Sequence, residues 1–396
     1  MHLPKLEPRS RRFARHSLAC SAWLGALLSF SSSLTTTQAD PLDVWHTRTS
    51  GVTNVLNADG YGNGAYVAVG NEGTIVTSSD GLAWTRRSSG TTSSLNSMVI
   101  VNGLFVVVGE GGVILTSTNG QSWTRRSSGT TDFLYDVNFG NGKFIAISDT
   151  GTVVSSTNGV TWSSSSGGPQ DAYGVAYGNS KFVAVGGVYS CPFFCYYYSV
   201  TYASADGVTW AQSTPGPSYL LSDVAFGNGK FVAVGDGGTI LTSINGTSWS
   251  LPVSGASEVL WNVAFGNGTF VVVGGQQGGI FSSTNAVTWT NRNSGTGNGL
   301  FNVAYANGTF LAVGLNGTIR QSDPVVPPPR LAISVAGSSL RFSWPLAAGA
   351  FSLQEADNLS TPAWSPTPNQ MATNVGDQTI VTVAVPTANR FYRLVR

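Results

Sequence analysis

The chain has 396 residues, of which 41% are hydrophobic and 10% charged, and its formal net charge is +1. A nearly neutral chain lacks the basic surface that attracts nucleic acids or acidic membranes, so we expect no nucleic-acid partner. Glycine is abundant, with 49 residues, and no long stretch after residue 40 has helical periodicity. Together these features predict an all-β protein.

The first 39 residues have the pattern of an export signal. A basic segment containing Arg11 and Arg12 precedes an apolar run over residues 18–30, and small residues end at Ala39. The apolar run is too short for a transmembrane anchor, so we expect none. The chain is therefore predicted to be exported to the periplasm, the extracellular space or the cell surface. A twin-arginine route is the weaker alternative to the general one.

Residues 40–323 repeat a unit typified by Asp223–Ser250. Short apolar runs in it are separated by turns, and Asn245-Gly246 is a strong signal for a tight hairpin. The connections are too short for parallel crossovers, so each unit predicts an antiparallel meander of four strands. Tryptophans mark the period with spacings of 39, 39, 39, 48, 39 and 40, at Trp45, Trp84, Trp123, Trp162, Trp210, Trp249 and Trp289. Such repeats predict a seven-bladed β-propeller.

The two ends of this array complete each other. The last unit stops at Ser322 without a tryptophan strand, and Pro324 follows. Residues 44–51 match residues 83–90 almost position for position but have no strands before them. We therefore expect residues 44–51 to supply the fourth strand of the last blade. This closure by an N-terminal strand removes an exposed sheet edge.

A proline-rich linker, residues 324–330, is predicted to follow the propeller. Residues 331–396 lose the repeat and show short strand patterns at 331–335, 339–344, 350–355, 379–385 and 390–395. A segment of this length with this pattern predicts a small C-terminal β-sandwich-like domain.

The turn before each tryptophan has a recurrent form, as in Ser78–Trp84, Ser117–Trp123 and Ser156–Trp162. These segments resemble the Asp-box, or BNR, hairpin of sialidase-like propellers, with one residue fewer between Asp and Gly. The wider repeat is similar to photosystem II stability/assembly factor propellers. The resemblance covers residues 40–323 and implies that the Asp or Asn side chain bonds turn amides while the tryptophan packs between sheets.

The same resemblance implies no sialidase activity. That family needs three arginines converging at the propeller axis, a Tyr–Glu pair and an acidic Asp. Here all propeller arginines except Arg320 follow a tryptophan in the outermost strand. Assembling the arginine set would break the register of the repeat.

One blade departs from the pattern between Gly186 and Tyr202, where the hairpin is nine residues longer than its neighbours. Tyrosine-rich loops favour contact with proteins or stacking on sugars. We therefore predict a binding surface at Tyr189, Phe193, Phe194, Tyr196, Tyr197 and Tyr198; the alternative is a local cluster of buried rings. Cys191 and Cys195 are expected to form a disulfide, because two thiols without a nearby histidine supply only half a zinc site.

Three acidic residues are predicted to lie on the same face as this insert. Asp136 and Asp223 begin first strands near the channel, and Asp236 lies in a turn between the second and third strands. We predict ligand contacts at these three residues, against the alternative that they serve the turns or the repeat. No Ser-His-Asp set or metal cluster is present, so we expect no catalytic residue, metal or cofactor.

These patterns favour a secreted or cell-surface, non-catalytic and monomeric propeller that acts as a binding scaffold for a protein or a glycan. The alternative is an extracellular carbohydrate-active enzyme that uses channel carboxylates, with Asp136 and Asp223 as the candidate pair.

Overall fold

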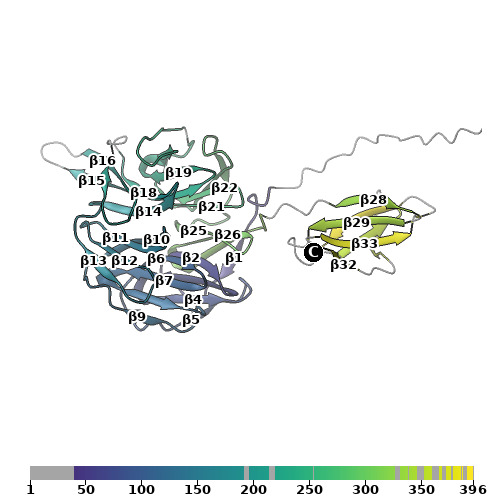
Figure 1. Ribbon diagram of the computed structural model, residues 1–396, viewed down its shortest axis with the longest axis horizontal. Helices are drawn as coiled ribbons and strands as arrows, with labels where there is room; N and C mark the ends of the chain where they lie inside the picture. The colour runs from purple at the N-terminus through teal and green to yellow at the C-terminus, as the bar shows by residue number, and fades with distance from the viewer. Residues whose placement is uncertain are drawn as a thin grey trace, which may run out of the picture. The chain divides into compact units, whose positions relative to one another are not determined.

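The computed structural model describes residues 40–190, 196–213, 219–252, 254–325, 331–337, 339–345, 352–358, 365–367, 372–375, 378–384, 386 and 390–395 (Figure 1). Regular structure in these residues consists of β-strands and four short 3-10 turns, which confirms the all-β prediction. No helix in the described part is long and apolar enough to cross a bilayer.

Between residues 45 and 322 the strands form successive antiparallel sheets. Their strands, from first to last, are β2 (Leu56–Gly62), β3 (Ala65–Gly70), β4 (Ile75–Ser78) and β5 (Thr85–Arg87); β6 (Leu95–Val101), β7 (Leu104–Gly109), β8 (Ile114–Ser117) and β9 (Thr124–Arg126); β10 (Leu134–Gly140), β11 (Lys143–Ser148), β12 (Val153–Ser156) and β13 (Ser163–Ser165).

The next sheets are β14 (Ala172–Gly178), β15 (Lys181–Ser190), β16 (Tyr196–Ser204) and β17 (Ala211–Gln212); β18 (Leu221–Gly227), β19 (Lys230–Gly235) and β20 (Ile240–Ser243); β21 (Leu260–Gly266), β22 (Thr269–Gly274), β23 (Gly279–Ser283) and β24 (Thr290–Arg292). The last consists of β25 (Leu300–Ala306), β26 (Thr309–Gly314), β27 (Thr318–Ser322) and β1 (Trp45–Thr49).

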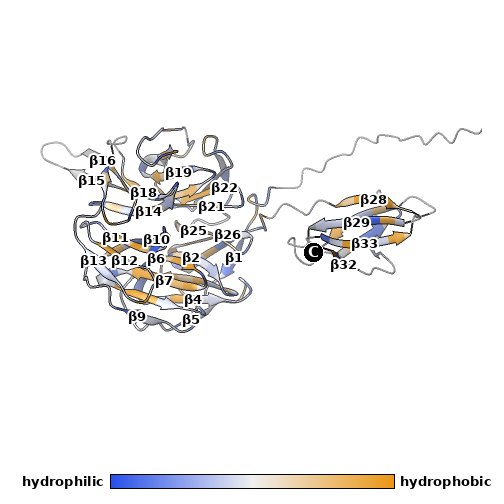
Figure 2. Cartoon of the chain, viewed as in Figure 1, coloured by the Kyte–Doolittle hydropathy of each residue, from blue (hydrophilic) through white to orange (hydrophobic). Residues whose placement is uncertain are grey.

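These sheets are arranged as a ring. The first strands of successive sheets contact one another in chain order, and β25 of the last sheet contacts β2 of the first. The hydrophobic core lies between neighbouring sheets, as where Val67 of β3 packs with Phe105 and Val107 of β7. Figure 2 shows the hydrophobic residues concentrated in the strands. A single four-stranded sheet cannot cover its own two faces, so the ring is what buries them.

The strand β1 closes the ring as the sequence predicts. It pairs antiparallel with β27, from Trp45 opposite Ser322 to Thr49 opposite Thr318. Trp45 is buried, and its indole Nε1 donates to the carbonyl oxygen of Leu42 at 3.0 Å. Arg292 forms ion pairs with Asp40 and Asp43 just before this strand. The edge of β27 is therefore covered by a strand from the other end of the chain.

The turns before the tryptophans are held by side chains. In the first of them, Asp80 Oδ1 accepts hydrogen bonds from the amides of Leu82 and Ala83 at 2.8 and 3.0 Å. These amides, led by that of Ala83, lower the pKa of Asp80 to about 2. The indole Nε1 of Trp84 donates to the Gly81 carbonyl oxygen at 3.2 Å. Trp123 and Trp162 make the same hydrogen bond, whereas the indole Nε1 atoms of Trp210, Trp249 and Trp289 have no hydrogen-bond partner among the described residues.

The unit that typifies the repeat, Asp223–Ser250, has a shorter outer strand than predicted. In place of a fourth strand after Trp249, one bridge joins Thr242 to Ser250. Pro252 follows two residues later. Proline has no backbone N–H to donate, so the ladder cannot continue past it.

The described residues after 330 form two further antiparallel sheets. One has the order β28 (Ala332–Ala336), β29 (Ser339–Pro345), β33 (Gln378–Ala384) and β32 (Thr373–Val375); the other has β31 (Ser365–Pro366), β30 (Ser352–Ala356) and β34 (Phe391–Val395). Phe342, Trp344 and Val381 of the first sheet share a buried cluster with Leu353 of the second. The two sheets are therefore packed face to face around one small core.

Candidate functional site

Every first strand between β2 and β25 carries a β-bulge at the same place. In β10, for example, Leu134 pairs with Ser148 and Asp136 pairs with Ile147, so Tyr135 between them has no partner of its own. A bulge turns the unpaired side chain away from the regular alternation of the strand. The bulged residues are Asn57, Asn96, Tyr135, Tyr173, Ser222, Trp261 and Phe301.

All of these bulged residues line a single cavity of about 660 Å³, which we call the channel mouth. Its further lining residues include Phe133, Leu220, Asp136, Asp223, Asp236, Asn262 and Asn302. The repeat therefore delivers one side chain from each sheet to the same opening. The fold fixes the position of that side chain and leaves its chemistry free to vary.

Aromatic rings gather on two parts of the channel mouth. Phe133 and Tyr135 have ring centroids 4.5 Å apart, and Tyr135 and Tyr173 lie 5.1 Å apart. Trp261 and Phe301 form a second pair at 5.8 Å. Burial, aided by the charge of Asp149, raises the pKa of Tyr135 to about 12, so its hydroxyl stays protonated. These rings offer flat, half-buried surfaces with polar edges, which suit stacking on a ligand.

The two asparagines among the bulged residues make contacts between sheets. Asn57 Nδ2 donates to the carbonyl oxygen of Leu95 in the next sheet at 3.0 Å, and Asn96 Nδ2 donates to that of Leu134 at 2.9 Å. These two amides therefore join neighbouring sheets, and the other bulged residues are Ser222 and the four aromatic ones.

Two carboxylates predicted as ligand contacts lie just inside the mouth and also join sheets. Asp136 Oδ1 accepts from the hydroxyl of Ser97 at 2.5 Å, and its Oδ2 accepts from the amide of Val175 at 2.7 Å. Asp223 Oδ2 accepts from the side chain of Asn262 at 2.7 Å and from the amide of Val263 at 3.0 Å. Asp136 therefore ties its sheet to the sheets on both sides, and Asp223 ties its sheet to the next one.

Burial governs the ionisation of this pair. Loss of solvation raises the pKa of Asp136 to about 6, against the opposing effect of its hydrogen-bond donors. Loss of solvation, followed by the charge of Asp136, raises the pKa of Asp223 well above its usual value. A proton on either carboxylate relieves the repulsion between them.

A third channel carboxylate, Asp59, is one that sequence reasoning missed. It is 4% exposed, and neither of its oxygens has a hydrogen-bond partner among the described residues. Burial raises its pKa well above the usual value. The signal in the sequence is that other first strands carry apolar residues at this position, namely Met98, Val137, Val175, Val224, Val263 and Val303.

The structure brings together part of the predicted site. Asp136, Asp223 and Asp236 all line the channel mouth, and burial raises the pKa of Asp236. Residues 191–195, with Cys191, Phe193, Phe194 and Cys195, lie outside the described residues, as do the side chains of Tyr189, Tyr196 and Tyr197. Tyr198 is half-buried on β16, and its neighbour along that strand, Tyr202, packs against the core.

The long hairpin nevertheless begins beside the mouth. Figure 1 shows β15 and β16 extending past the neighbouring strands. The hydroxyl of Tyr173, a mouth residue, donates to the carbonyl oxygen of Gly187 in β15 at 3.4 Å. The predicted insert and the observed cavity therefore meet at this strand.

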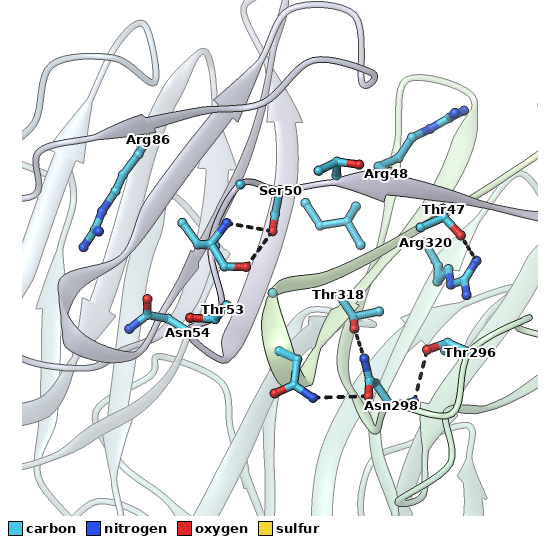
Figure 3. Close-up of a pocket in the computed structure, with 16 residues that line it drawn as sticks. Thr47, Arg48, Ser50, Thr53, Asn54, Arg86, Thr296, Asn298, Thr318 and Arg320 are labelled. Atoms are coloured by element: carbon cyan, nitrogen blue, oxygen red, sulfur yellow. Dashed lines mark hydrogen bonds between the residues drawn. The ribbon is translucent and has the colours of Figure 1, made fainter.

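A second cavity, of about 530 Å³, lies where β1 meets the first sheet and contains Arg48, Arg86 and Arg320. Figure 3 shows Arg86 well apart from the other two. Arg48 Nε donates to Gln321 at 2.9 Å, and Arg320 donates to Thr47 and to the carbonyl oxygen of Gly295. These arginines do not converge on a common point, and the hydrogen bonds of Arg48 and Arg320 hold the closing strand.

The described residues contain no group of three His, Cys, Asp or Glu side chains able to hold a metal ion. The ring of antiparallel sheets around a lined channel defines a β-propeller.

Comparison with solved structures supports this class. YCF48 bound to a D1 peptide is 17% identical, with a TM-score of 0.56, over 70% of this chain and 94% of that one. YCF48 from Cyanidioschyzon merolae is 16% identical, with a TM-score of 0.55, over 72% and 99%. The WD40 β-propeller domain of Doa1 is 13% identical, with a TM-score of 0.52, over 70% and 97%. At these identities the likeness shows the fold alone. No family model and no curated protein matches the chain.

Proposed function

We propose that this chain is an exported, seven-bladed, non-catalytic propeller that binds a segment of polypeptide at the channel mouth. One observation carries the proposal: each first strand turns its bulged residue into the same cavity, and Tyr135, Tyr173, Trp261 and Phe301 supply aromatic rings there. Aromatic residues at the centre of a cavity carry much of the binding energy in protein complexes.

A polypeptide partner is favoured over a glycan by the comparison with YCF48, whose structure includes a bound D1 peptide. Stacking on a sugar ring uses the same aromatic surfaces, so a glycan is the second candidate. The hydrolase alternative is less well supported, because Asp136 and Asp223 are both engaged in hydrogen bonds between sheets. A general acid and base must instead reach the substrate.

Replacing Trp261 with serine tests the proposal, because Ser222 occupies the same repeat position in β18. We expect Trp261→Ser to weaken binding at least about tenfold, since aromatic anchors dominate such interfaces. The measurement is binding of purified protein to an array of random dodecapeptides and to a glycan array, followed by titration of the peptides retained.

The matched control is Ile244→Thr, which changes a residue that is 70% exposed in a turn before a tryptophan, at a position where Thr118 and Thr157 stand in other repeats. This variant should bind as the wild type does. Equal peptide affinities for Trp261→Ser and the wild type, at equal melting temperatures, contradict the proposal. Binding to glycans without binding to peptides selects the second candidate.

A further inference from the structure

The turns between second and third strands begin at one repeat position, and in three units a polar side chain at this position is engaged within its own unit. The acceptors are Asn71, Glu110 and Asp149, and their donors are the Asn57 side chain at 2.8 Å, the Ser94 amide at 3.4 Å and the Tyr135 hydroxyl at 3.4 Å. Asp236 holds the same position in the unit of β18, β19 and β20. The bulged residue of that unit is Ser222, whose side chain is shorter than those of Asn57 and Tyr135.

The carboxylate of Asp236 is free and accessible. It makes no hydrogen bond or ion pair with the described residues, and its pKa is raised by the loss of solvation alone. Asp236 is half-buried and lines the channel mouth. Its oxygens, unlike those of Asp59, are not buried. A ligand in the mouth can therefore meet the acceptor atoms of Asp236.

The turn that carries Asp236 adjoins the strand that carries Trp261. Residues Asp236–Gly238 contact β21, and Trp261 is the bulged residue of β21 that lines the mouth. Trp261 is half-buried, so part of its ring remains accessible. The face of a tryptophan ring attracts a cation more strongly than that of tyrosine or phenylalanine. Asp236 and Trp261 thus place a carboxylate and an aromatic ring at adjoining parts of one cavity.

The charge of the channel mouth is of one sign. The described residues that line it include Asp136, Asp223 and Asp236 and no Lys, Arg or His. The lysine of the same unit is at the other end of the sheet, because Lys230 begins β19 whereas Asp236 follows that strand. Residues 40–323 contain fifteen acidic and ten basic residues, so this part of the chain is negative although the whole chain is not. Such a mouth attracts cations and repels anions.

We propose that the channel mouth receives the ammonium or guanidinium group of a Lys or Arg side chain of the bound polypeptide, with Asp236 as its acceptor and Trp261 as its aromatic wall. This inference rests on the proposed function and names the residue type that the site selects. Burial leaves the charge of Asp236 poorly solvated, and a cation beside it compensates for the lost water. An acidic peptide would instead add a like charge to this cavity.

The first test asks whether an isolated cation reaches this site. Protein with isotope-labelled tryptophan is titrated with n-butylammonium chloride and followed by NMR, with n-butanol as the uncharged control and sodium chloride as the control for ionic strength. We expect the indole N–H signal of Trp261, assigned by its loss in Trp261→Ser, to shift to saturation with n-butylammonium alone. The shift should be absent in Asp236→Asn.

The repeat supplies both the safe substitution and its control. Asp236→Asn introduces the residue type of Asn71, at the same repeat position, so the variant should melt as the wild type does. Glu110→Gln removes one negative charge at that position of another unit, outside the described lining of the mouth, and should respond to n-butylammonium as the wild type does. No shift in the wild type, or an equal shift in Asp236→Asn, overturns the cation site whatever peptides the mouth binds.

The peptides retained in the array experiment provide the second arm. They should contain Lys or Arg, and replacing that residue by uncharged norleucine or citrulline should weaken binding to the wild type and to Glu110→Gln about tenfold, as expected for a close charge pair. The same replacement should have little effect on binding to Asp236→Asn, because the partner charge is already absent there.

The two arms separate this inference from the proposed function. Retained peptides without Lys or Arg, or equal losses of affinity in the wild type and Asp236→Asn, overturn the inference while the proposed function stands. A response to n-butylammonium without any retained peptide has the opposite meaning: the cation site stands, its ligand is a free amine, and the proposed function fails.

Discussion

At the scale of single residues, Asp136 and Asp223 join neighbouring sheets although their burial disfavours the charged form of the carboxyl group. Asp136 accepts hydrogen bonds from the sheets on both sides, which lower its pKa. The loss of solvation has the larger effect, so the pKa of Asp136 is raised. Asn262 holds the equivalent position in another sheet and accepts from the amide of Val303 at 3.0 Å. A neutral acceptor can therefore make this joint between sheets, and Ala58 and Gly174 hold the equivalent position in two other sheets without any side-chain acceptor.

This balance predicts how stability depends on pH. An aspartate in the unfolded chain has a pKa of about 4, whereas burial raises the pKa of Asp136 in the folded protein to about 6. Between these values the native state holds a proton that the unfolded state has released, so the free energy of unfolding falls as the pH rises from about 4 to 6. Chemical denaturation across this range measures the effect.

The variant Asp136→Asn isolates this contribution, because Asp59, Asp171, Asp223 and Asp236 also have raised pKa values and add to the same slope. Its free energy of unfolding should fall less steeply over the same range than that of the wild type. Identical slopes would show that Asp136 ionises as it does in the unfolded chain.

At the scale of strands and turns, much was predictable because each repeat carries its own local signals. The Asn-Gly turns and the tryptophan period predict the meander, and the likeness of residues 44–51 to 83–90 predicts the pairing of β1 with β27. The fourth strand expected after Trp249 is reduced to a single bridge. The cause is Pro252, a residue type that the other repeats do not have at this position.

The bulges could not be predicted in this way. A bulge is a mismatch in length between two paired strands, and Tyr135 or Trp261 fits a regular strand equally well by its residue type. The sequence does contain a contrast within the repeat. Most units have a leucine at the position of Leu134, whereas the type of the next residue varies, from asparagine at Asn57 to tryptophan at Trp261. Such variation beside a fixed core position indicates a side chain freed from packing.

Removing the closing strand should affect the whole ring. A chain that begins at Val52 loses the β1 pairing, the buried Trp45 and the ion pairs of Arg292. Burial of a tryptophan alone is worth about 3–5 kcal/mol, and the freed edge of β27 would be open to other chains. We expect a sharply lower melting temperature, measured by circular dichroism, and more aggregation.

The control for this truncation is a chain that begins at Asp40 and so differs from the test variant by twelve residues only. It should melt as the full chain does. Equal melting temperatures for the two truncated chains would mean that β1 contributes nothing to the ring.

At the scale of the molecule, the strands after residue 330 have a core of their own. The cluster of Phe342, Trp344, Leu353 and Val381 includes no residue of the propeller sheets. We expect this part to unfold separately from the propeller, as an independent domain with its own core does.

Trp344, which is 1% exposed, tests this independence. Trp344→Ala should destabilise the C-terminal part by about 3–5 kcal/mol and leave peptide binding at the channel mouth unchanged. Calorimetry should show two transitions in the wild type, of which only one moves in the variant. Trp45→Ala should move the other. A shift of both transitions by either variant would indicate one cooperative unit.

The pairing of β1 with β27 has a consequence for the order in which the protein is made. The strand β1 leaves the ribosome before the other strands of the ring, yet its partner ends at Ser322. During synthesis β1 therefore stays unpaired until almost the whole propeller has been made. The same holds if the chain crosses a membrane in an extended form. Closure of the ring is therefore the last step. An incomplete chain that stops before β27 leaves β1 without its partner and exposes the edge of β26.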